Sequence, residues 1–277
     1  MISRCCHVLT FTCFIFFLTL GTDLRAADWP TEIVARYDIS FAGFHVGSFD
    51  FRSSANSNEY SLSGEANISA IFGAFVWTGS TYSHGRTRHE KPNPASYVFY
   101  YRSNINSGSV RLDFMKGHIV RSDVSPYQPY TNQHVPLHRE HMRDVYDPIS
   151  AVMALTRSAR GHPCQQRLPI FDGKQRFDLV LIPNGRKKIS EEQPSGQPNF
   201  AHICKIQYVP IAGYQPNSQI DYMANNSNMR IILREIPSAK LLVPYEVRIP
   251  TFAGEAVLSS RKVSITTSQH RRIALIP

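Results

Sequence analysis

The sequence predicts a mainly β fold, in which a large curved antiparallel sheet, or open barrel, wraps one α-helix and carries one disulfide. Short stretches of alternating apolar and polar residues, separated by turn residues, run through most of the chain after residue 33. One segment, at about 147–159, instead places its apolar residues at helical spacing. Two cysteines remain once an N-terminal leader is set aside. A hydrophobic content of 42% excludes a disordered or collagen-like chain.

Residues 1–27 have the pattern of a secretory signal peptide. Arg4 supplies positive charge, the run 8–20 is almost entirely apolar, and Ala26-Ala27 offers a small-residue cleavage site. This run is shorter than the roughly 20 apolar residues that a spanning helix needs. We therefore expect cleavage near Ala27 and a periplasmic protein that does not span the membrane. An uncleaved N-terminal anchor is the alternative.

The remaining residues, 28–277, are expected to form a single β-rich periplasmic domain. Residues 1–27 contain two of the 30 basic and one of the 21 acidic residues, which leaves 28 basic and 20 acidic residues and a net charge of +8. A basic chain suits acidic partners such as lipid headgroups, lipopolysaccharide phosphates or anionic glycans. Nucleic acid is not expected as a partner, because the predicted location is outside the cytoplasm.

Turn residues divide this domain into strands. Ala42-Gly43, Lys116-Gly117 and Asp172-Gly173 each lie between two apolar stretches, and Asp-Gly is a strong hairpin signal. The segment 91–94 is expected to interrupt regular structure before the strand 97–101. The expected strands are 34–41, 44–51, 60–68, 75–82, 97–101, 110–114, 119–120, 167–171, 176–182, 201–209, 229–236, 243–250 and 256–267.

Two polar segments are expected to lie outside regular structure. Residues 183–199 are rich in proline and glycine, which predicts a mobile loop. The basic residues near the C-terminus, including Arg271 and Arg272, are expected to belong to a frayed tail.

The segment 147–159 carries clear helix signals. Asp147 suits the N-cap and Pro148 the first helical position, while Gly161 lies just past the expected end. An antiparallel sheet needs a partner on its inner face, and this helix is the candidate. The residues expected to share its apolar face are Ile149, Val152, Met153 and Thr156.

Cys164 and Cys204 are the two cysteines of residues 28–277. In an oxidising compartment such a pair predicts one structural disulfide, closing a loop of about 41 residues. A redox-active pair usually has Cys-x-x-Cys spacing, which is absent, and two cysteines alone are a poor metal site.

Five motifs in order resemble the exported bacterial proteins grouped as domain of unknown function 3108. The resemblance runs from about residue 33 to 265, and it implies a β-rich periplasmic protein of unassigned activity. It supplies no catalytic residues, because none are established for the family. The motifs are Tyr37 to Gly47, Gly85 with Pro94 and Tyr97, Asp147-Pro148-Ile149-Ser150-Ala151, Cys164 with Phe171 to Phe177, and Cys204 with Pro210-Ile211-Ala212-Gly213-Tyr214.

Three histidines give the hypothesis of a metal-dependent hydrolase. His134, His138 and His141 would share one face of a helix, and three imidazoles can hold Zn²⁺ with one open position. Pro136 interrupts this spacing, so solvated histidines in an irregular segment are the preferred interpretation, and no cofactor is expected.

Five arginines on neighbouring strands are candidates for binding an anionic partner. The alternative is an ordinary solvated outer face of the sheet. The candidates are Arg86, Arg88, Arg102, Arg111 and Arg121.

Aromatic residues in two strands are candidates for contacting an apolar ligand. The stretch from Ile71 to Trp77 is the densest apolar segment, and burial in the core is its preferred interpretation, with a ligand cavity as the alternative. The candidates are Phe72, Phe75, Trp77, Tyr97, Phe99 and Tyr101.

From these features we expect a non-catalytic periplasmic protein that supports the cell envelope by binding an envelope component, either a protein, a lipid or an anionic glycan. A carrier or chaperone for lipid or another apolar ligand, held in a half-barrel cavity, is the first alternative. The second is the hydrolase at the three histidines.

Overall fold

The computed structural model describes residues 30–88, 91–127, 129–157 and 161–277. The predicted signal peptide, 1–27, lies outside these ranges. No helix within them is long and apolar enough to cross a bilayer.

Within the described ranges, fourteen strands form one antiparallel sheet that is not closed. The order across the sheet is β7-β6-β5-β4-β3-β2-β1-β13-β12-β11-β10-β9-β8, and β14 pairs with β13. The strands are β1 (Pro30–Phe41), β2 (Phe44–Ala55), β3 (Glu59–Ala70), β4 (Phe75–Arg88), β5 (Lys91–Ser103), β6 (Ser107–Met115), β7 (His118–Ser125), β8 (Gln166–Phe171), β9 (Arg176–Lys188), β10 (Phe200–Ala212), β11 (Arg230–Ile236), β12 (Leu241–Thr251), β13 (Gly254–Thr267) and β14 (Arg272–Leu275).

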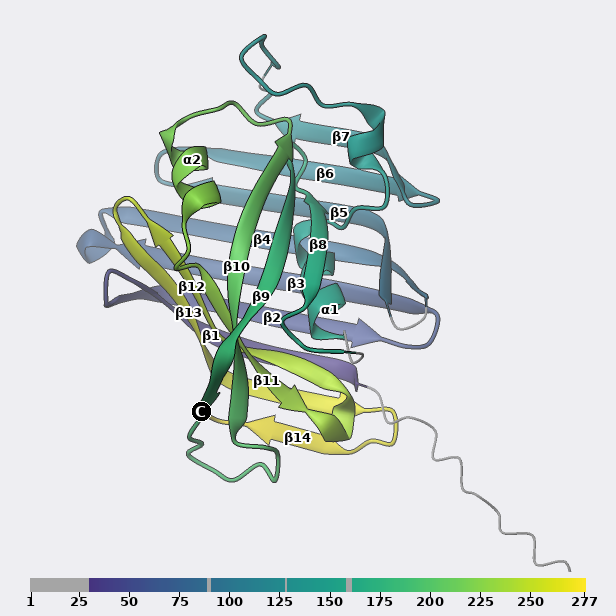
Figure 1. Cartoon of the computed structure of the whole chain (residues 1–277), viewed down its shortest axis with the longest axis vertical. Coiled ribbons are helices and arrows are strands. Elements are labelled where there is room, and N and C mark those ends of the chain that lie inside the picture. The colour runs from purple at the N-terminus through teal and green to yellow at the C-terminus, as the bar shows by residue number, and fades with distance from the viewer. Residues whose placement is uncertain (1–29, 89–90, 128, 158–160) are drawn as a thin grey trace, which may run out of the picture.

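The sheet curves around the helix α1 (Pro148–Thr156), as Figure 1 shows. In that view β8 to β10 cross in front of the long strands β3 to β6, and α1 lies between the two layers and contacts both. This arrangement confirms the predicted mainly β fold wrapping one helix. The other short helices are α2 (Ser218–Asn225) and the 3₁₀ turns η1 (Ile71–Gly73), η2 (Arg139–Met142) and η3 (Pro237–Ala239).

The open edges of the sheet, β7 and β8, approach each other without forming a ladder. The Ser122 hydroxyl of β7 donates a hydrogen bond of 3.0 Å to the carbonyl of Gly173, in the turn after β8. The Tyr130 hydroxyl donates to the carbonyl of Lys174 in the same turn, at 2.6 Å. The backbone N–H groups of Asp144 and Tyr146 also donate to the carbonyls of Gly117 and Pro169, at 2.7 and 2.9 Å. These separate hydrogen bonds bridge the gap that a closed barrel would fill with a strand pair.

The predicted hairpin turns are present, and their backbone conformation explains why glycine occurs in them. Ala42 and Gly43 have φ of 49° and 86°, and Lys116 and Gly117 have φ of 54° and 79°. Positive φ at both central residues matches the right-handed twist of the flanking strands. The Asp172 carboxylate accepts hydrogen bonds from two backbone N–H groups of its own turn.

The core lies on both sides of α1. Ile149 and Met153 pack into a cluster with Tyr60 and Leu112 from the layer of β3 to β6. Leu155 packs into a second cluster that contains the disulfide and residues of β8 to β12. The helix thus stabilises the fold because two of its sides pack against the inner face of the curved sheet.

The polar segment 183–199 is more ordered than predicted. Residues 183–188 continue β9 and pair with β10. The fully buried Arg234 of β11 holds the rest, because its guanidinium donates to the Glu191 carboxylate at 2.5 Å and to the carbonyl of Pro198 at 3.1 Å. Composition alone predicts a loop because these partners are far apart in sequence.

Three other expectations about local structure need correction. The segment 91–94 belongs to β5, with a register shift at Pro94 that accommodates the prolines. Arg272 lies in β14 rather than in a frayed tail. The helix α1 ends at Thr156, and 158–160 lie outside the described residues. The short helix α2 was not predicted, although Asn217 caps it.

The dense apolar stretch from Ile71 to Trp77 does not lie in the core, contrary to the preferred interpretation of the sequence. Ile71 and Phe72 are 75% and 111% exposed at the tip of the β3–β4 hairpin. Phe75 and Trp77 are half-buried on the inner face of β4. A tip that projects beyond the neighbouring strands has nothing to pack against, whatever its hydropathy.

Candidate functional site

A buried polar network anchors the start of α1 on the sheet. The Asp147 carboxylate caps the helix by accepting from the Ser150 backbone N–H at 2.9 Å, and it also accepts from the Ser83 hydroxyl at 3.0 Å. The Ser150 hydroxyl lies 2.9 Å from those of both Ser83 and Tyr60. All four side chains are buried. The predicted N-cap is therefore confirmed, and the structure adds Ser83 of β4 as a partner of Asp147 and Tyr60 of β3 as a partner of Ser150.

Burial raises the pKa of Asp147, although hydrogen bonds from Ser150 and Ser83 oppose the shift. Burial raises the pKa of Asp172 in the same way, against the N–H groups of Gln175 and Lys174. Neither carboxylate faces an open cavity alongside a nucleophile. Their geometry fits a structural role, since Asp147 accepts from a backbone N–H at the start of a helix and Asp172 accepts from two in a hairpin turn.

On the inner face of the sheet, one row of paired residues has aromatic side chains on both sides of two small residues. Paired residues across the row are Tyr37 on β1, Phe49 on β2, Ala66 on β3, Gly79 on β4 and Tyr101 on β5. The adjacent inner-face positions hold Trp77 and Phe99, whose ring centroids lie 6.4 Å apart.

Glycines make room for these aromatic rings to lie along the sheet. A Cβ on Gly79 would be 2.2 Å from the Trp77 indole, and one on Gly64 would be 2.8 Å from the Phe49 ring. Half-buried aromatic rings therefore form a concave surface toward the ends of the strands that α1 does not reach. We name this surface, made by Phe49, Trp77, Phe99 and Tyr101, the open apolar face.

An apolar cavity of about 130 Å³ adjoins the open apolar face beneath α1. Phe49 belongs to the open apolar face and also lines the cavity. The other lining residues include Val152 of α1, Val247 of β12 and Leu258 of β13. Val152 lines the interior but is still 37% exposed, because no side chain fills the cavity that it faces. An engineered apolar cavity of about 150 Å³ holds benzene, so this volume suits one ring or a few methylene groups.

The predicted apolar-ligand residues divide between these environments. Trp77, Phe99 and Tyr101 lie on the open apolar face, and Phe75 is half-buried at its margin. Tyr97 is buried in the core beside α1. Phe72 lies apart, at the hairpin tip. The sequence did not single out Phe49 or Val152 for this site, because nothing local marks them as neighbours of a cavity.

The three histidines do not form a metal set. His134 lines a separate cavity of about 300 Å³ between β7, the β8–β9 turn and α2, and its Nδ1 accepts from the Thr131 N–H at 3.1 Å. His138 and His141 contact each other, with ring centroids 5.5 Å apart. In the part of the chain that the structure describes, no three His, Cys, Asp or Glu side chains are grouped as a metal site requires.

The five arginines all point to the outer face but do not form one patch. Arg111 and Arg121 each pair with an aspartate two residues along the same strand, Asp113 and Asp123. Arg102 lies at the opposite end of the β4–β5 pair from Arg86.

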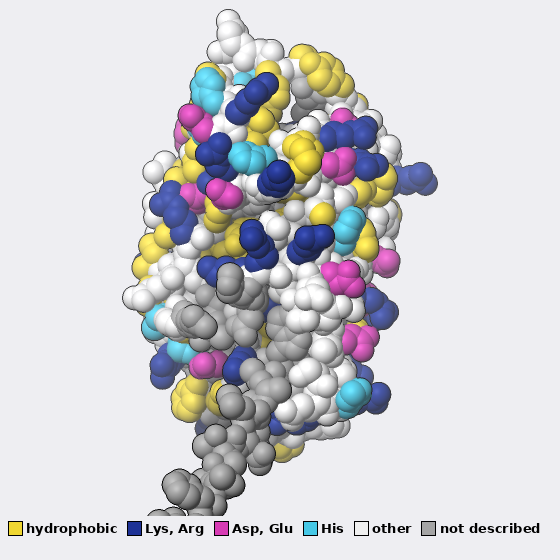
Figure 2. All heavy atoms as spheres, turned by 90° about the vertical axis from the view of Figure 1, so that its right-hand side faces the viewer, with side chains coloured by type: hydrophobic (Ala, Val, Ile, Leu, Met, Phe, Trp, Pro, Cys, Tyr) yellow, Lys and Arg dark blue, Asp and Glu magenta, His cyan; other side chains and the backbone are white. Residues whose placement is uncertain are grey.

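Arg86 and Arg88 line a groove of about 1130 Å³ together with Lys116. Figure 2 shows the side of the molecule on the right of Figure 1, where Lys and Arg side chains gather over the upper half. Glu59 and Asp144 also line the groove, so its charge is mixed.

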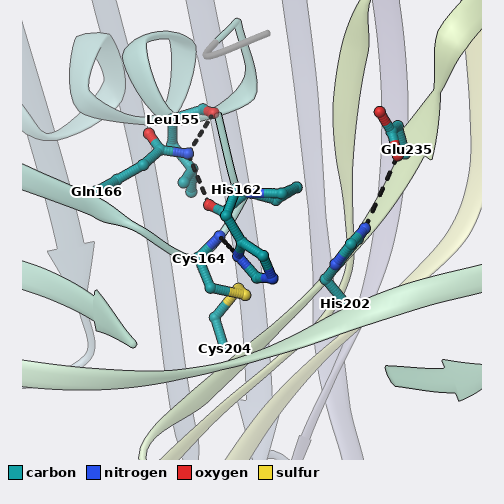
Figure 3. Close-up of a disulfide and its surroundings, with 8 residues drawn as sticks. Leu155, His162, Cys164, Gln166, His202, Cys204 and Glu235 are labelled. Atoms are coloured by element: carbon teal, nitrogen blue, oxygen red, sulfur yellow. Dashed lines mark hydrogen bonds and ion pairs between the residues drawn. A yellow bond between two sulfur atoms is a disulfide. The ribbon is translucent and has the colours of Figure 1, made fainter. Parts of the chain in front are cut away.

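The disulfide joins Cys164 to Cys204 with a Cα–Cα distance of 5.2 Å, which confirms the predicted pair. Two histidines lie beside it (Figure 3): His162 Nδ1 accepts from the Cys164 N–H at 3.1 Å, and the His202 ring meets the His162 ring edge-on. Burial lowers the pKa of His202, with Arg186 and His162 adding to the effect and Glu235 opposing it. His202 is therefore neutral near pH 7.

Comparisons with known proteins identify the family. Neither the curated proteins nor the solved structures contained a match to this chain. The family profile described as "Protein of unknown function (DUF3108)" matches residues 36–260, which covers most of the sheet, α1 and the disulfide. The chain therefore belongs to this family, as its five ordered motifs predicted.

Proposed function

We propose that this protein is a non-catalytic binding protein of the cell envelope, and that it holds an apolar part of an envelope component on the open apolar face. The observation that carries the proposal is the row of half-buried aromatic rings next to a solvent-connected apolar cavity. Exposed aromatic surface lined by few polar groups is typical of sites for apolar ligands.

The size of the cavity limits what the site holds. A volume of about 130 Å³ is below the roughly 300 Å³ of typical small-molecule pockets. The cavity therefore suits the end of one acyl chain or one aromatic side chain, and the rest of the ligand would lie on Phe49, Trp77 and Tyr101.

The proposed location is the periplasm. The pattern of residues 1–27 supports export, and a disulfide between Cys164 and Cys204 is expected to persist in an oxidising compartment. Fusion of the chain to alkaline phosphatase, which is active only outside the cytoplasm, tests this part independently of any ligand.

A fluorescent apolar probe tests the binding site. N-phenyl-1-naphthylamine should brighten on binding the wild-type protein, and fatty acids should displace it. Val152→Phe fills the cavity from α1 and should weaken probe binding about tenfold or more, while Val120→Phe on the exposed edge strand β7 should change nothing. Equal probe affinity for the wild type and Val152→Phe, with both folded, would contradict the proposal.

A carrier of lipid between surfaces is a second candidate. The specific observation in its favour is that the open apolar face extends beyond α1 toward the hairpin ends, so an acyl chain there would leave without unfolding of the helix. A carrier should accelerate transfer of a fluorescent phospholipid between vesicles. A static binding protein should bind the probe yet leave the transfer rate unchanged.

A further inference from the structure

Four neighbouring hairpins end in large apolar side chains that face solvent. These side chains are between 65% and 111% exposed, whereas most large apolar residues of a soluble fold are at least half-buried. We name the four tips together the hairpin rim. Its apolar side chains are Phe44, Ile71, Phe72, Ile105 and Phe252.

The sheet topology places the four tips along one edge. The hairpins β5–β6, β3–β4, β1–β2 and β12–β13 follow one another in the sheet, with tips at the same end of the strands. Strands lie about 4.8 Å apart, so neighbouring tips are about 10 Å apart and the rim extends about 30 Å. Figure 1 shows the β3–β4 and β12–β13 turns projecting together at the left.

The backbone at one tip is in a conformation that its residues disfavour. Ile71 and Phe72 have φ of 53° and 54°, in the left-handed region where glycine or asparagine is usual. A β-branched residue in this region is rare, and such conformations concentrate at functional sites. The sequence thus keeps two bulky apolar residues at a position where packing does not require them.

Charge around the rim is sparse. Among residues 41–46, 69–76, 102–107 and 249–255, the residues charged at neutral pH are Arg102 and Glu255. The Glu255 carboxylate accepts from Arg248 at 2.8 Å, whereas Arg102 is exposed and has no ion pair within the described residues. The rim therefore carries no uncompensated negative charge, and residues 28–277 as a whole are basic.

We propose that the hairpin rim docks on the surface of a bilayer that contains anionic lipid. A fluid interface accepts separate apolar side chains about 10 Å apart, whereas a protein partner would need pockets matched to each tip. Arg102 and the net positive charge of the protein would add attraction to anionic headgroups. This inference is independent of ligand binding on the open apolar face.

Vesicle flotation tests the proposal. Protein recovered from cells that express the full chain is mixed with vesicles of phosphatidylethanolamine and phosphatidylglycerol, or with phosphatidylcholine vesicles. Wild-type protein should float with the anionic vesicles, and Phe72→Asp or Ile105→Asp should each lower the partition coefficient about tenfold. Met115→Asp is the matched control, because Met115 is 60% exposed at the β6–β7 hairpin, at the opposite end of the strands.

Each result either supports docking through the rim or overturns it. Equal flotation of the wild type and both rim variants, with folding verified by circular dichroism, overturns the proposal, and so does an equal loss in Met115→Asp. A wild type that stays with the soluble fraction as a dimer, which Phe72→Asp dissociates, would make the rim an interface between copies instead. Val152→Phe should float normally even where it loses probe binding, so failure of the proposed function leaves this test intact.

Discussion

The indole of Trp77 occupies the space that a side chain on Gly79 would need, since a Cβ there would be 2.2 Å from the ring. Both residues lie on the inner face of β4, two positions apart, so the glycine sets how the indole lies on the open apolar face.

Gly79→Ala should therefore displace the indole while preserving the fold. The clash is with the far end of a flexible side chain, so the free energy of unfolding should change by less than about 1 kcal/mol. Affinity for N-phenyl-1-naphthylamine should fall severalfold in a fluorescence titration. Ser80→Ala, on the outer face of the same strand, is the control and should bind like the wild type. Unchanged affinity in Gly79→Ala would remove Trp77 from the site.

Replacing Asp147 should separate its capping role from its charge. Asp147→Ala removes the buried acceptor for both the Ser150 N–H and the Ser83 hydroxyl, so it should cost about 2–4 kcal/mol in urea unfolding. Asp147→Asn keeps an acceptor for the N–H and should cost less than about 1.5 kcal/mol. Equal losses in both variants would show that hydrogen bonding is not the main contribution.

The stability of Asp147→Asn should depend on pH differently from that of the wild type, because the pKa of Asp147 is raised in the folded protein. A carboxyl whose pKa is higher in the folded than in the unfolded state favours folding at low pH, and this contribution is lost as pH rises through the folded pKa. The stability of Asp147→Asn relative to wild type should therefore increase with pH above about 4 and then level off. Asp172, whose pKa is also raised, is present in both proteins and cancels. A difference that is independent of pH would contradict the shift.

Removing the disulfide should lower stability without changing the fold. Cys164→Ser with Cys204→Ser releases a loop of about 41 residues, for which chain entropy gives ~4 kcal/mol. Urea unfolding with and without reductant measures the loss, and the double variant should no longer respond to reductant. Wild-type protein that is equally stable in reductant, with its thiols then shown to be free, would refute this role.

The ion pair between the buried Arg234 and the half-buried Glu191 should hold the segment after β9. Arg234→Ala leaves the Glu191 carboxylate without its ion-pair partner and removes the donor to the carbonyls of Pro198 and Gln197, at a cost of about 3 kcal/mol. Limited proteolysis should then cut within 190–199 faster than in the wild type. The control Arg121→Ala breaks an exposed pair and should cost less than about 1 kcal/mol.

Local signals predicted much of the fold. The turn residues Ala42-Gly43 and Lys116-Gly117 specify their conformation within two positions, and Asp147 marks the helix start within one turn. Cys164 and Cys204 are the two cysteines left once the leader is excluded, so only one disulfide could form between them. These features depend on backbone geometry or simple counting, which the sequence carries directly.

The candidate site was less predictable because it depends on contacts between distant residues. Ser83 and Asp147 are 64 residues apart, and nothing near Ser83 shows that it faces a helix cap. Strand periodicity placed Trp77, Phe99 and Tyr101 correctly on strands but could not show that α1 leaves them uncovered. Hydropathy likewise predicted burial for Ile71 and Phe72, because it does not register that a hairpin tip projects beyond its neighbours.

The sheet that ends at β7 and β8 has no fixed circumference. In a closed barrel the number of strands and their stagger determine the radius, and widening it means breaking a complete ladder. Here the seam is held by hydrogen bonds such as those from Ser122 and Tyr130 to the β8–β9 turn. Widening the interior therefore means breaking these side-chain bonds and the few backbone bonds that Asp144 makes to Gly117 and Tyr146 makes to Pro169, but no complete strand pair. The range of ligand widths that the interior can hold thus depends on this seam rather than on the strands.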